Sequence, residues 1–271
     1  MVEVDPQPSD VPVELREAIE QLIASPPVQG LLLVGSRSRG YHDSKSDYDL
    51  EVIVDDDFAH TLEPAARLSL VWDGKPHRSR LLGDILTESR SSFEGKTNST
   101  LDVDHWPYEA AVLWYDRDGE IGPLVKAIAR FPDDIWEERL KLHYVDFWYH
   151  TARALKIAER ESTLNHGLVL YRAAYACIQC IFVLNRRWPP LPHWTEQALE
   201  RSELRLRPTD DVALLTKALT THDAQALQRL HDALDPLLDA EEITWHHNRV
   251  TLLLEILGSD FHDARERWAA F

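Results

Sequence analysis

Two aspartates, Asp47 and Asp49, stand one residue apart at the start of a short apolar stretch, residues 50–54, that is typical of a buried strand. In an extended chain alternate side chains point to the same face, so the two carboxylates are expected to lie side by side. Neighbouring carboxylates repel each other unless a cation lies between them. Mg²⁺ prefers oxygen ligands and is commonly shared between protein carboxylates and substrate phosphates. The spacing therefore predicts that Asp47 and Asp49 are ligands for Mg²⁺.

A second apolar stretch, residues 31–34, predicts a strand that ends at Gly35-Ser36. Gly35 and Gly40 have the separation of a phosphate-binding P-loop, but Tyr41-His42 stands where that loop has Lys and Ser or Thr, so the P-loop is excluded. Backbone amides after Gly35 and the Ser36 hydroxyl could instead hold a triphosphate. Two basic residues downstream, Arg37 and Arg39, are expected to assist as nucleotide ligands.

A strand, then Gly35-Ser36, a basic turn and an Asp-x-Asp pair at Asp47 and Asp49 together resemble the signature of the DNA polymerase β-like nucleotidyltransferase superfamily. Ser46, directly before the first aspartate, also fits the frequent Ser-Asp-x-Asp-Leu form. The resemblance implies Mg²⁺ on the aspartates and nucleoside triphosphate phosphates at the Gly-Ser turn. It also implies a third carboxylate on a neighbouring strand, as a metal ligand or as the base that activates the acceptor hydroxyl.

The sequence offers no obvious third carboxylate. We expect a hairpin with a strand at residues 68–72, a turn at Asp73-Gly74 and a return strand at 77–82, followed by a helix near residues 84–90. By position the acid should lie within residues 77–80, where none stands. Nearby candidates are Asp73, Asp102 and Asp104, of which we choose Asp104 as the third catalytic residue. An altered or inactive enzyme, or a base supplied by Asp146 of the helical half, remains an alternative.

From Pro123 onward strand signals vanish and helical periodicity continues to the C-terminus. We therefore predict an α+β fold, with a small mixed-sheet nucleotidyltransferase domain over residues 1–131 and an all-α helical bundle over residues 132–271. The stretch 167–185 is apolar nearly all round and should be the buried centre of the bundle. The arrangement resembles small aminoglycoside and kanamycin nucleotidyltransferases, in which the helical domain binds the substrate.

Polar residues in this helical half are candidates for substrate binding. Arg172 and Tyr175 lie along one helix with Gln179, and Asp146 lies on the helix before it. This polar line is either a satisfied core network or a surface that binds nucleotide or acceptor. His193 stands where the related domains often carry lysine, which weakens any phosphate-binding role. His246 and His247 are expected at a helix surface rather than on a metal.

Composition limits the partners and the compartment. The formal net charge is −17, from 46 acidic and 29 basic residues, which disfavours a nucleic-acid partner and suits a cationic small molecule. The N-terminus lacks the pattern of a signal peptide, and no membrane span is expected. Two cysteines, Cys177 and Cys180, are predicted to be buried thiols, in agreement with a reducing cytoplasm.

The combined prediction is a Mg²⁺-dependent cytoplasmic enzyme that transfers a nucleoside monophosphate, AMP from ATP, to a hydroxyl of a small-molecule acceptor. The acceptor could be antibiotic-like. Two alternatives stay open: a toxin-type nucleotidyltransferase that modifies tRNA or a protein, and a catalytically altered relative that only binds nucleotide.

Overall fold

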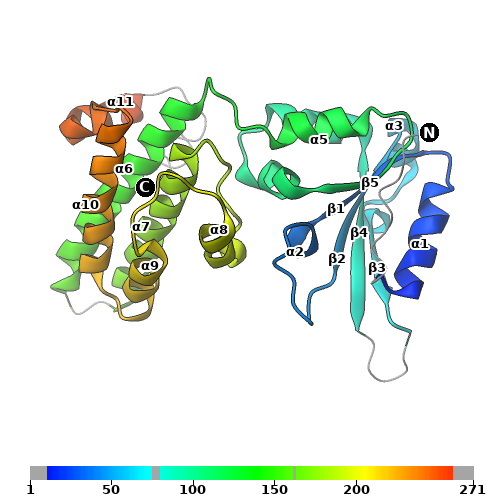
Figure 1. Ribbon diagram of the computed structural model, residues 1–271, viewed down its shortest axis with the longest axis horizontal. Coiled ribbons are helices and arrows are strands. Elements are labelled where there is room, and N and C mark those ends of the chain that lie inside the picture. Colours follow the sequence, from blue (N-terminus) through cyan, green and yellow to red (C-terminus); the bar gives the residue numbers. More distant parts are fainter. Residues whose placement is uncertain (1–10, 75–79, 161–162, 259–271) are drawn as a thin grey trace. The chain divides into compact units, whose positions relative to one another are not determined.

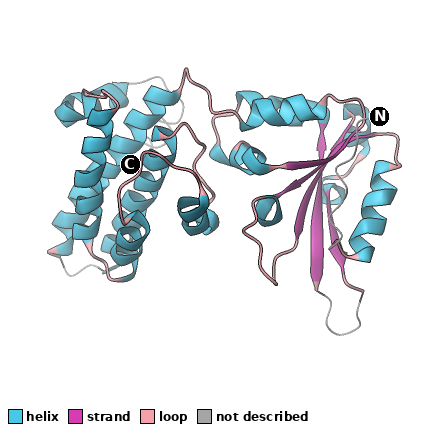
Figure 2. Ribbon diagram, viewed as in Figure 1, coloured by secondary structure: helices cyan, strands magenta, loops and turns pink. Residues whose placement is uncertain are grey.

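The structure is a computed structural model of the 271-residue chain and describes residues 11–74, 80–160 and 163–258. The chain forms two compact units, Met1–Arg130 and Phe131–Phe271. The first contains a sheet with flanking helices and the second contains helices (Figures 1 and 2). The predicted α+β fold class, a small mixed sheet followed by a helical bundle, is confirmed.

The first unit is built on one five-stranded sheet with the strand order β3-β4-β2-β1-β5. Its strands are β1 (Val28–Val34), β2 (Tyr48–Val54), β3 (Leu68–Trp72), β4 (Leu81–Ser89) and β5 (Val112–Asp116). Strands β2 and β4 pair in parallel, whereas the other neighbours are antiparallel. The parallel pair brings the beginnings of β2 and β4 to the same edge of the sheet.

Both faces of the central strands are covered, which explains why β1 and β2 are apolar along their length. Leu31 and Leu50 pack on one face with the helix α1 (Val13–Ile23). Leu32 and Ile53 pack on the opposite face against α5 (Ile121–Ala129). Three short helices connect the strands: α2 (Gly35–Ser38), α3 (Asp56–Thr61) and α4 (Arg90–Gly95).

The return strand of the hairpin lies later than the sequence predicts. Part of the predicted strand at residues 77–82 falls outside the described residues. The predicted helix over 84–90 is wrong because residues 84–89 belong to β4, and Arg90 is the first residue of α4. Pairing of β4 with both β2 and β3 satisfies its backbone hydrogen bonds. Gly83 permits the close approach, since a Cβ there would lie 2.7 Å from the Tyr48 carbonyl oxygen. The helix α4 begins only after Ser89, whose side chain caps it by accepting from the Ser92 amide.

The second unit is a bundle around α7 (Thr163–Leu184), with α6 (Trp136–Ala158) and α10 (Ala224–Ala240) packed against it. The remaining helices are α8 (Thr195–Arg201), α9 (Asp211–Thr220) and α11 (Arg249–Gly258). Cys177 and Cys180 are fully buried in α7, as predicted, and burial raises the pKa of both thiols.

Among the described helices, α7 is long and apolar enough to cross a membrane by length and composition. However, 67% of its most apolar window is buried inside the helical unit. A helix at the centre of a bundle has the same composition, so α7 is accounted for as the core of this unit.

Candidate functional site

The turn after β1 is shaped around the carboxylate of Asp49. Gly35 has a φ of +70°, and a Cβ at this position would lie 1.9 Å from Asp49 Oδ2. A side chain of any kind would therefore be strained by the backbone and would collide with the carboxylate. The backbone amide of Ser36, which is buried, donates a hydrogen bond to Asp49. The Gly35-Ser36 turn and the Asp49 carboxylate thus form one local structure.

Asp84, at the start of β4, is the third acidic residue at this place. It is the direct register partner of Asp49 in the parallel β2–β4 pair, so the two side chains lie on the same face. We call Asp47, Asp49 and Asp84 the carboxylate cluster. Its members are half-buried.

The electrostatics of the carboxylate cluster favour the addition of positive charge. The pKa of Asp49 is raised to about 6 by burial first, then by the negative charges of Asp84 and Asp47. Burial and the charge of Asp47 also raise the pKa of Asp84. Within the described parts of the chain, no lysine or arginine forms an ion pair with these three carboxylates.

A magnesium ion fits this donor set, because hard oxygen ligands and two or more neighbouring negative charges are what it requires. In the described ranges, however, the cluster is not among the groups whose three ligand atoms lie within 4.8 Å of one another. Asp49 and one neighbour could hold the ion while the remaining carboxylate acts on a substrate.

The geometry favours Asp84 as the third carboxylate over Asp104, which we chose from the sequence. Asp104 lies on a 3₁₀ turn, Asp102–Asp104, where it accepts a hydrogen bond of 2.6 Å from Ser99 Oγ. It does not contribute to the raised pKa of Asp49, whereas Asp84 does. The sequence did contain a signal, since Gly83-Asp84 interrupts the apolar run at residues 81–86, but this dipeptide also suits the turn or helix start that we expected.

The two arginines predicted to bind phosphate are already engaged by the protein. Arg37 donates from Nε to the Asp47 carbonyl at 2.8 Å and from Nη2 to the Ser46 carbonyl at 2.8 Å. Its guanidinium lies 3.9 Å from the centre of the Tyr48 ring. The contacts of Arg37 stabilise the backbone that carries Asp47, and its charge lowers the pKa of Asp49 only as a minor contribution.

Arg39 lies farther along the same turn. Its guanidinium stacks 3.7 Å from the Trp106 ring centre, donates to the Trp106 carbonyl and lies 4.0 Å from Glu109 Oε2. The side chain is only 5% exposed. Phosphate binding by Arg39 would require these contacts to open.

A second acidic group follows the cluster on the same face of the sheet. Glu51, two residues after Asp49, is buried and accepts hydrogen bonds of 2.7 and 2.8 Å from the Tyr108 hydroxyl. Lys96 Nζ lies 2.8 Å from Glu51 Oε1 and also contacts Glu88. Burial, followed by a hydrogen bond with Glu88, raises the pKa of Glu51 to about 7. We call these four residues the Glu51–Lys96 network.

An exposed apolar stripe extends the same face beyond the cluster. Leu70 on β3 is the register partner of Asp84, and Leu68 is the partner of Leu86. Their side chains are about half exposed, as is that of Trp72 at the end of β3. Large apolar side chains beside carboxylates form a surface on which a molecule with both polar and apolar parts can bind.

In the helical unit, Asp146 and Arg172 contact each other. Asp146 is 3% exposed, and its Oδ1 lies 3.3 Å from Arg172 Nε and 3.2 Å from His150 Nε2. Of the two interpretations of this polar line, the core network accounts for these two residues. Substrate binding by Asp146 and Arg172 stays a prediction.

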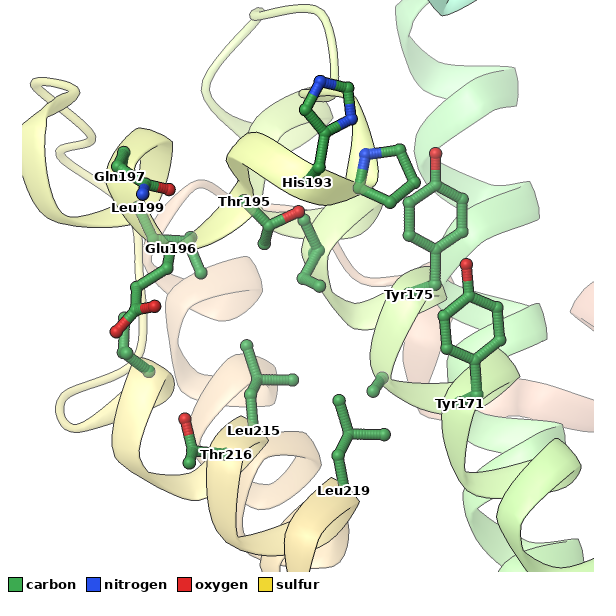
Figure 3. A pocket seen from close by; sticks show the side chains of 14 residues that line it. Tyr171, Tyr175, His193, Thr195, Glu196, Gln197, Leu199, Leu215, Thr216 and Leu219 are labelled. Atoms are coloured by element: carbon green, nitrogen blue, oxygen red, sulfur yellow. The ribbon is translucent and has the colours of Figure 1, made fainter. Parts of the chain in front are cut away.

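Tyr175 instead lines a pocket of about 300 Å³ within the helical unit (Figure 3). It lies parallel to Tyr171 on α7, with ring centres 6.1 Å apart and planes 2° apart. Leu215 and Leu219 of α9 form another wall, and Glu196 of α8 lies at the polar side. The size and mixed lining suit a small molecule with an apolar or planar part. His193 also lines this pocket.

Three comparisons relate this chain to known proteins. A family model described as a domain of unknown function (DUF4037) matches residues 107–195. No curated protein matches the chain. The crystal structure of a nucleotidyltransferase-like protein from Exiguobacterium sibiricum is similar, with 14% sequence identity, a TM-score of 0.44, and coverage of 92% of this chain and 80% of that chain. The family match begins after β4, so it contains none of the carboxylate cluster.

Proposed function

We propose that this chain is a cytoplasmic, Mg²⁺-dependent nucleotidyltransferase of the DNA polymerase β-like superfamily, with ATP as the nucleotide donor. The observation that carries this proposal is the carboxylate cluster, in which Asp84 of β4 lies beside Asp49 of β2 at the Gly35-Ser36 turn. The resemblance of the sequence to the superfamily requires a third carboxylate on a neighbouring strand, and Asp84 meets that requirement. The catalytically altered alternative rested on the lack of such a residue, and Asp84 is the reason that we propose an active enzyme instead.

In the proposed reaction, Asp47 and Asp49 hold Mg²⁺, which would neutralise the triphosphate and polarise the reacting phosphate. Gly35 and Ser36 would lie beside the phosphates, because the turn that they form is in contact with the Asp49 carboxylate that would hold the ion. Asp84 accepts the proton of the acceptor hydroxyl. The hydroxyl oxygen then bonds to the α-phosphorus, the bond between the α-phosphorus and the bridging oxygen breaks, and pyrophosphate leaves.

The acceptor is proposed to be a small molecule that carries a hydroxyl group, a positive charge and an apolar or planar part. The net charge of −17 disfavours nucleic acid and supports a cationic acceptor. The pocket beside Tyr175, with Glu196 among its lining residues, supports an acceptor of this chemistry.

The proposal is tested by comparing Asp84→Asn with Asp104→Asn, which makes the same change at a carboxylate outside the cluster. Each protein is incubated with Mg²⁺, α-labelled ATP and a panel of hydroxyl-bearing amines, and labelled product and pyrophosphate are measured. We expect Asp84→Asn to reduce transfer by at least about 10²-fold, the loss typical of a missing general base. Asp104→Asn should transfer nucleotide as the wild type does.

Two results would overturn the proposal. One is equal transfer by the wild type and Asp84→Asn; the other is wild-type binding of ATP that is independent of Mg²⁺. Labelling of added tRNA or of a partner protein, without labelling of the small amines, would favour the toxin-type alternative.

A further inference from the structure

A group of three metal-ligating side chains lies in the helical unit, at the end of α10. Asp239 belongs to the last turn of α10, while His246 and His247 follow on the 3₁₀ helix η6, Trp245–Asn248. One possible ligand atom from each of these three residues lies within 4.8 Å of the others. We call them the His–Asp group.

The distances within this group are close to those of a metal site. Asp239 Oδ1 lies 2.8 Å from His247 Nε2 and 3.4 Å from His246 Nε2. Ligands of a tetrahedral zinc ion, bound at about 2.0–2.1 Å, lie about 3.3 Å from one another. Small side-chain rotations would therefore bring the three atoms around one ion.

His246 supplies an independent indication that this group can bind a ligand. It is 2% exposed, and neither of its ring nitrogens has a hydrogen-bond partner. Buried polar atoms are rarely left in this state, since an unmade hydrogen bond costs free energy. The rings of Tyr144 and Trp245 pack edge-on against this imidazole, with centres 5.9 and 6.0 Å away, and keep its Nε2 near Asp239. A metal on Nε2 would satisfy that atom.

The ligand set selects the class of metal. Two imidazole nitrogens and one carboxylate oxygen suit Zn²⁺ or a similar divalent transition metal, whereas Mg²⁺ and Ca²⁺ prefer oxygen ligands alone. Asp239 and His247 are more than half exposed, so water can complete the coordination. Arg249 is the nearby cation, but its guanidinium is neutralised by Asp235 at 2.6 Å.

We propose that Asp239, His246 and His247 bind one Zn²⁺ ion that fastens the end of α10 to η6 and thereby to the start of α11. The site is independent of the carboxylate cluster and of the proposed nucleotidyl transfer. Its effect is structural, because the ion would join the last turn of α10 to η6 across the bend between them. The sequence had predicted a surface pair of histidines, and the burial of His246 corrects half of that prediction.

The test uses the full chain without a histidine tag, stripped with a chelator and kept in excess Mg²⁺ so that the carboxylate cluster is not available to zinc. We expect one Zn²⁺ per chain by titration calorimetry and a higher melting temperature of the zinc-loaded protein. Co²⁺ in the same site should give visible absorption bands of a four- or five-coordinate ion, which an octahedral oxygen site would not.

His247→Ala and Asp239→Asn alter exposed side chains and should leave the fold intact by circular dichroism. Each should weaken zinc binding by at least about tenfold and remove the Co²⁺ bands. His60→Ala, an exposed histidine on α3, should change neither. The proposal is overturned if the wild type binds no Zn²⁺ under these conditions, or if His247→Ala and Asp239→Asn bind it as the wild type does.

Discussion

Two pairs of acidic residues lie on the same face of β2 and β4, and they differ in whether the protein supplies a cation beside them. Glu51 and Glu88 share the ammonium group of Lys96, and Glu51 also accepts hydrogen bonds from the Tyr108 hydroxyl, so a cation and a hydrogen-bond donor of the protein face this pair. Asp49 and Asp84 lie nearer the start of the same two strands, and no lysine forms an ion pair with them within the described residues. Arg37 is nearby, but it donates its hydrogen bonds to backbone carbonyls.

This difference separates a structural role from a functional one. A buried ion-pair network that satisfies itself stabilises one arrangement of the strands and helices around it. Acidic residues kept together without compensation cost stability, and such an arrangement is typical of binding and catalytic sites. The carboxylate cluster is therefore the better candidate for a cation site, although the Glu51–Lys96 network is more deeply buried.

The largest expected effect comes from breaking the compensated group. Lys96→Met keeps the apolar stem but leaves Glu51 and Glu88 with no cation, which should lower the free energy of unfolding by roughly 3 kcal/mol. Urea unfolding measures this change. Lys126→Met removes an exposed lysine of the same unit and is the matched control. Equal losses in the two variants would show that the network contributes nothing specific.

The next effect concerns the turn that accommodates the cluster. Gly35→Ala places a methyl group against Asp49 at a backbone angle that favours glycine, so we expect a loss of about 2 kcal/mol in urea unfolding. Adding Asp49→Ala should recover part of this loss by removing the collision. Gly95→Ala is the control, because nothing lies within 4 Å of a Cβ there. Strictly additive losses in the double variant would contradict the collision.

Substitution of Asp49 is expected to have a smaller effect, and to raise rather than lower the free energy of unfolding. Its pKa is raised to about 6, so the folded state binds more protons than the unfolded state between about pH 4 and 6. This contribution to stability is complete below pH 4 and is lost as the pH rises through 6. Asp49→Asn should therefore stabilise the cation-free protein at pH 7.5 by about 1–2 kcal/mol, since partial exposure screens the repulsion.

The measurement is the melting temperature or urea midpoint from pH 4 to 8, with a chelator present. Added Mg²⁺ should reverse the order, stabilising the wild type more than Asp49→Asn, and should bind more tightly at pH 7.5 than at pH 5 because the carboxyl must lose its proton. If the difference in stability between Asp49→Asn and the wild type is the same at pH 4 as at pH 7.5, the repulsion within the cluster is contradicted.

The smallest effect is expected for Asp104→Asn. This change weakens the hydrogen bond from Ser99 and should cost less than about 1 kcal/mol in urea unfolding. Mg²⁺ affinity, measured by calorimetry, should equal that of the wild type, whereas Asp84→Asn should bind Mg²⁺ more weakly. A greater loss of Mg²⁺ affinity in Asp104→Asn than in Asp84→Asn would restore Asp104 as the third carboxylate.

The sequence by itself was sufficient to predict the parts that depend on local chain geometry. The two central strands follow from short apolar runs. Asp47 and Asp49 are close in the chain, and the charge of Asp47 raises the pKa of Asp49. The change from strand patterns to helical periodicity after Pro123 was likewise visible in the sequence. The apolar stretch that forms α7 is 22 residues long, which is too long for a typical strand.

Only the tertiary structure shows which residues far apart in the sequence lie next to these strands and helices. Asp84 lies beside Asp49 because β4 pairs in parallel with β2, a register set by long-range contacts that no local pattern encodes. Lys96 reaches Glu51 from the turn after α4, and His246 is buried by aromatic rings from other parts of the bundle. Charge compensation depends on such distances in space, so the sequence could predict the first two carboxylates but not their third neighbour.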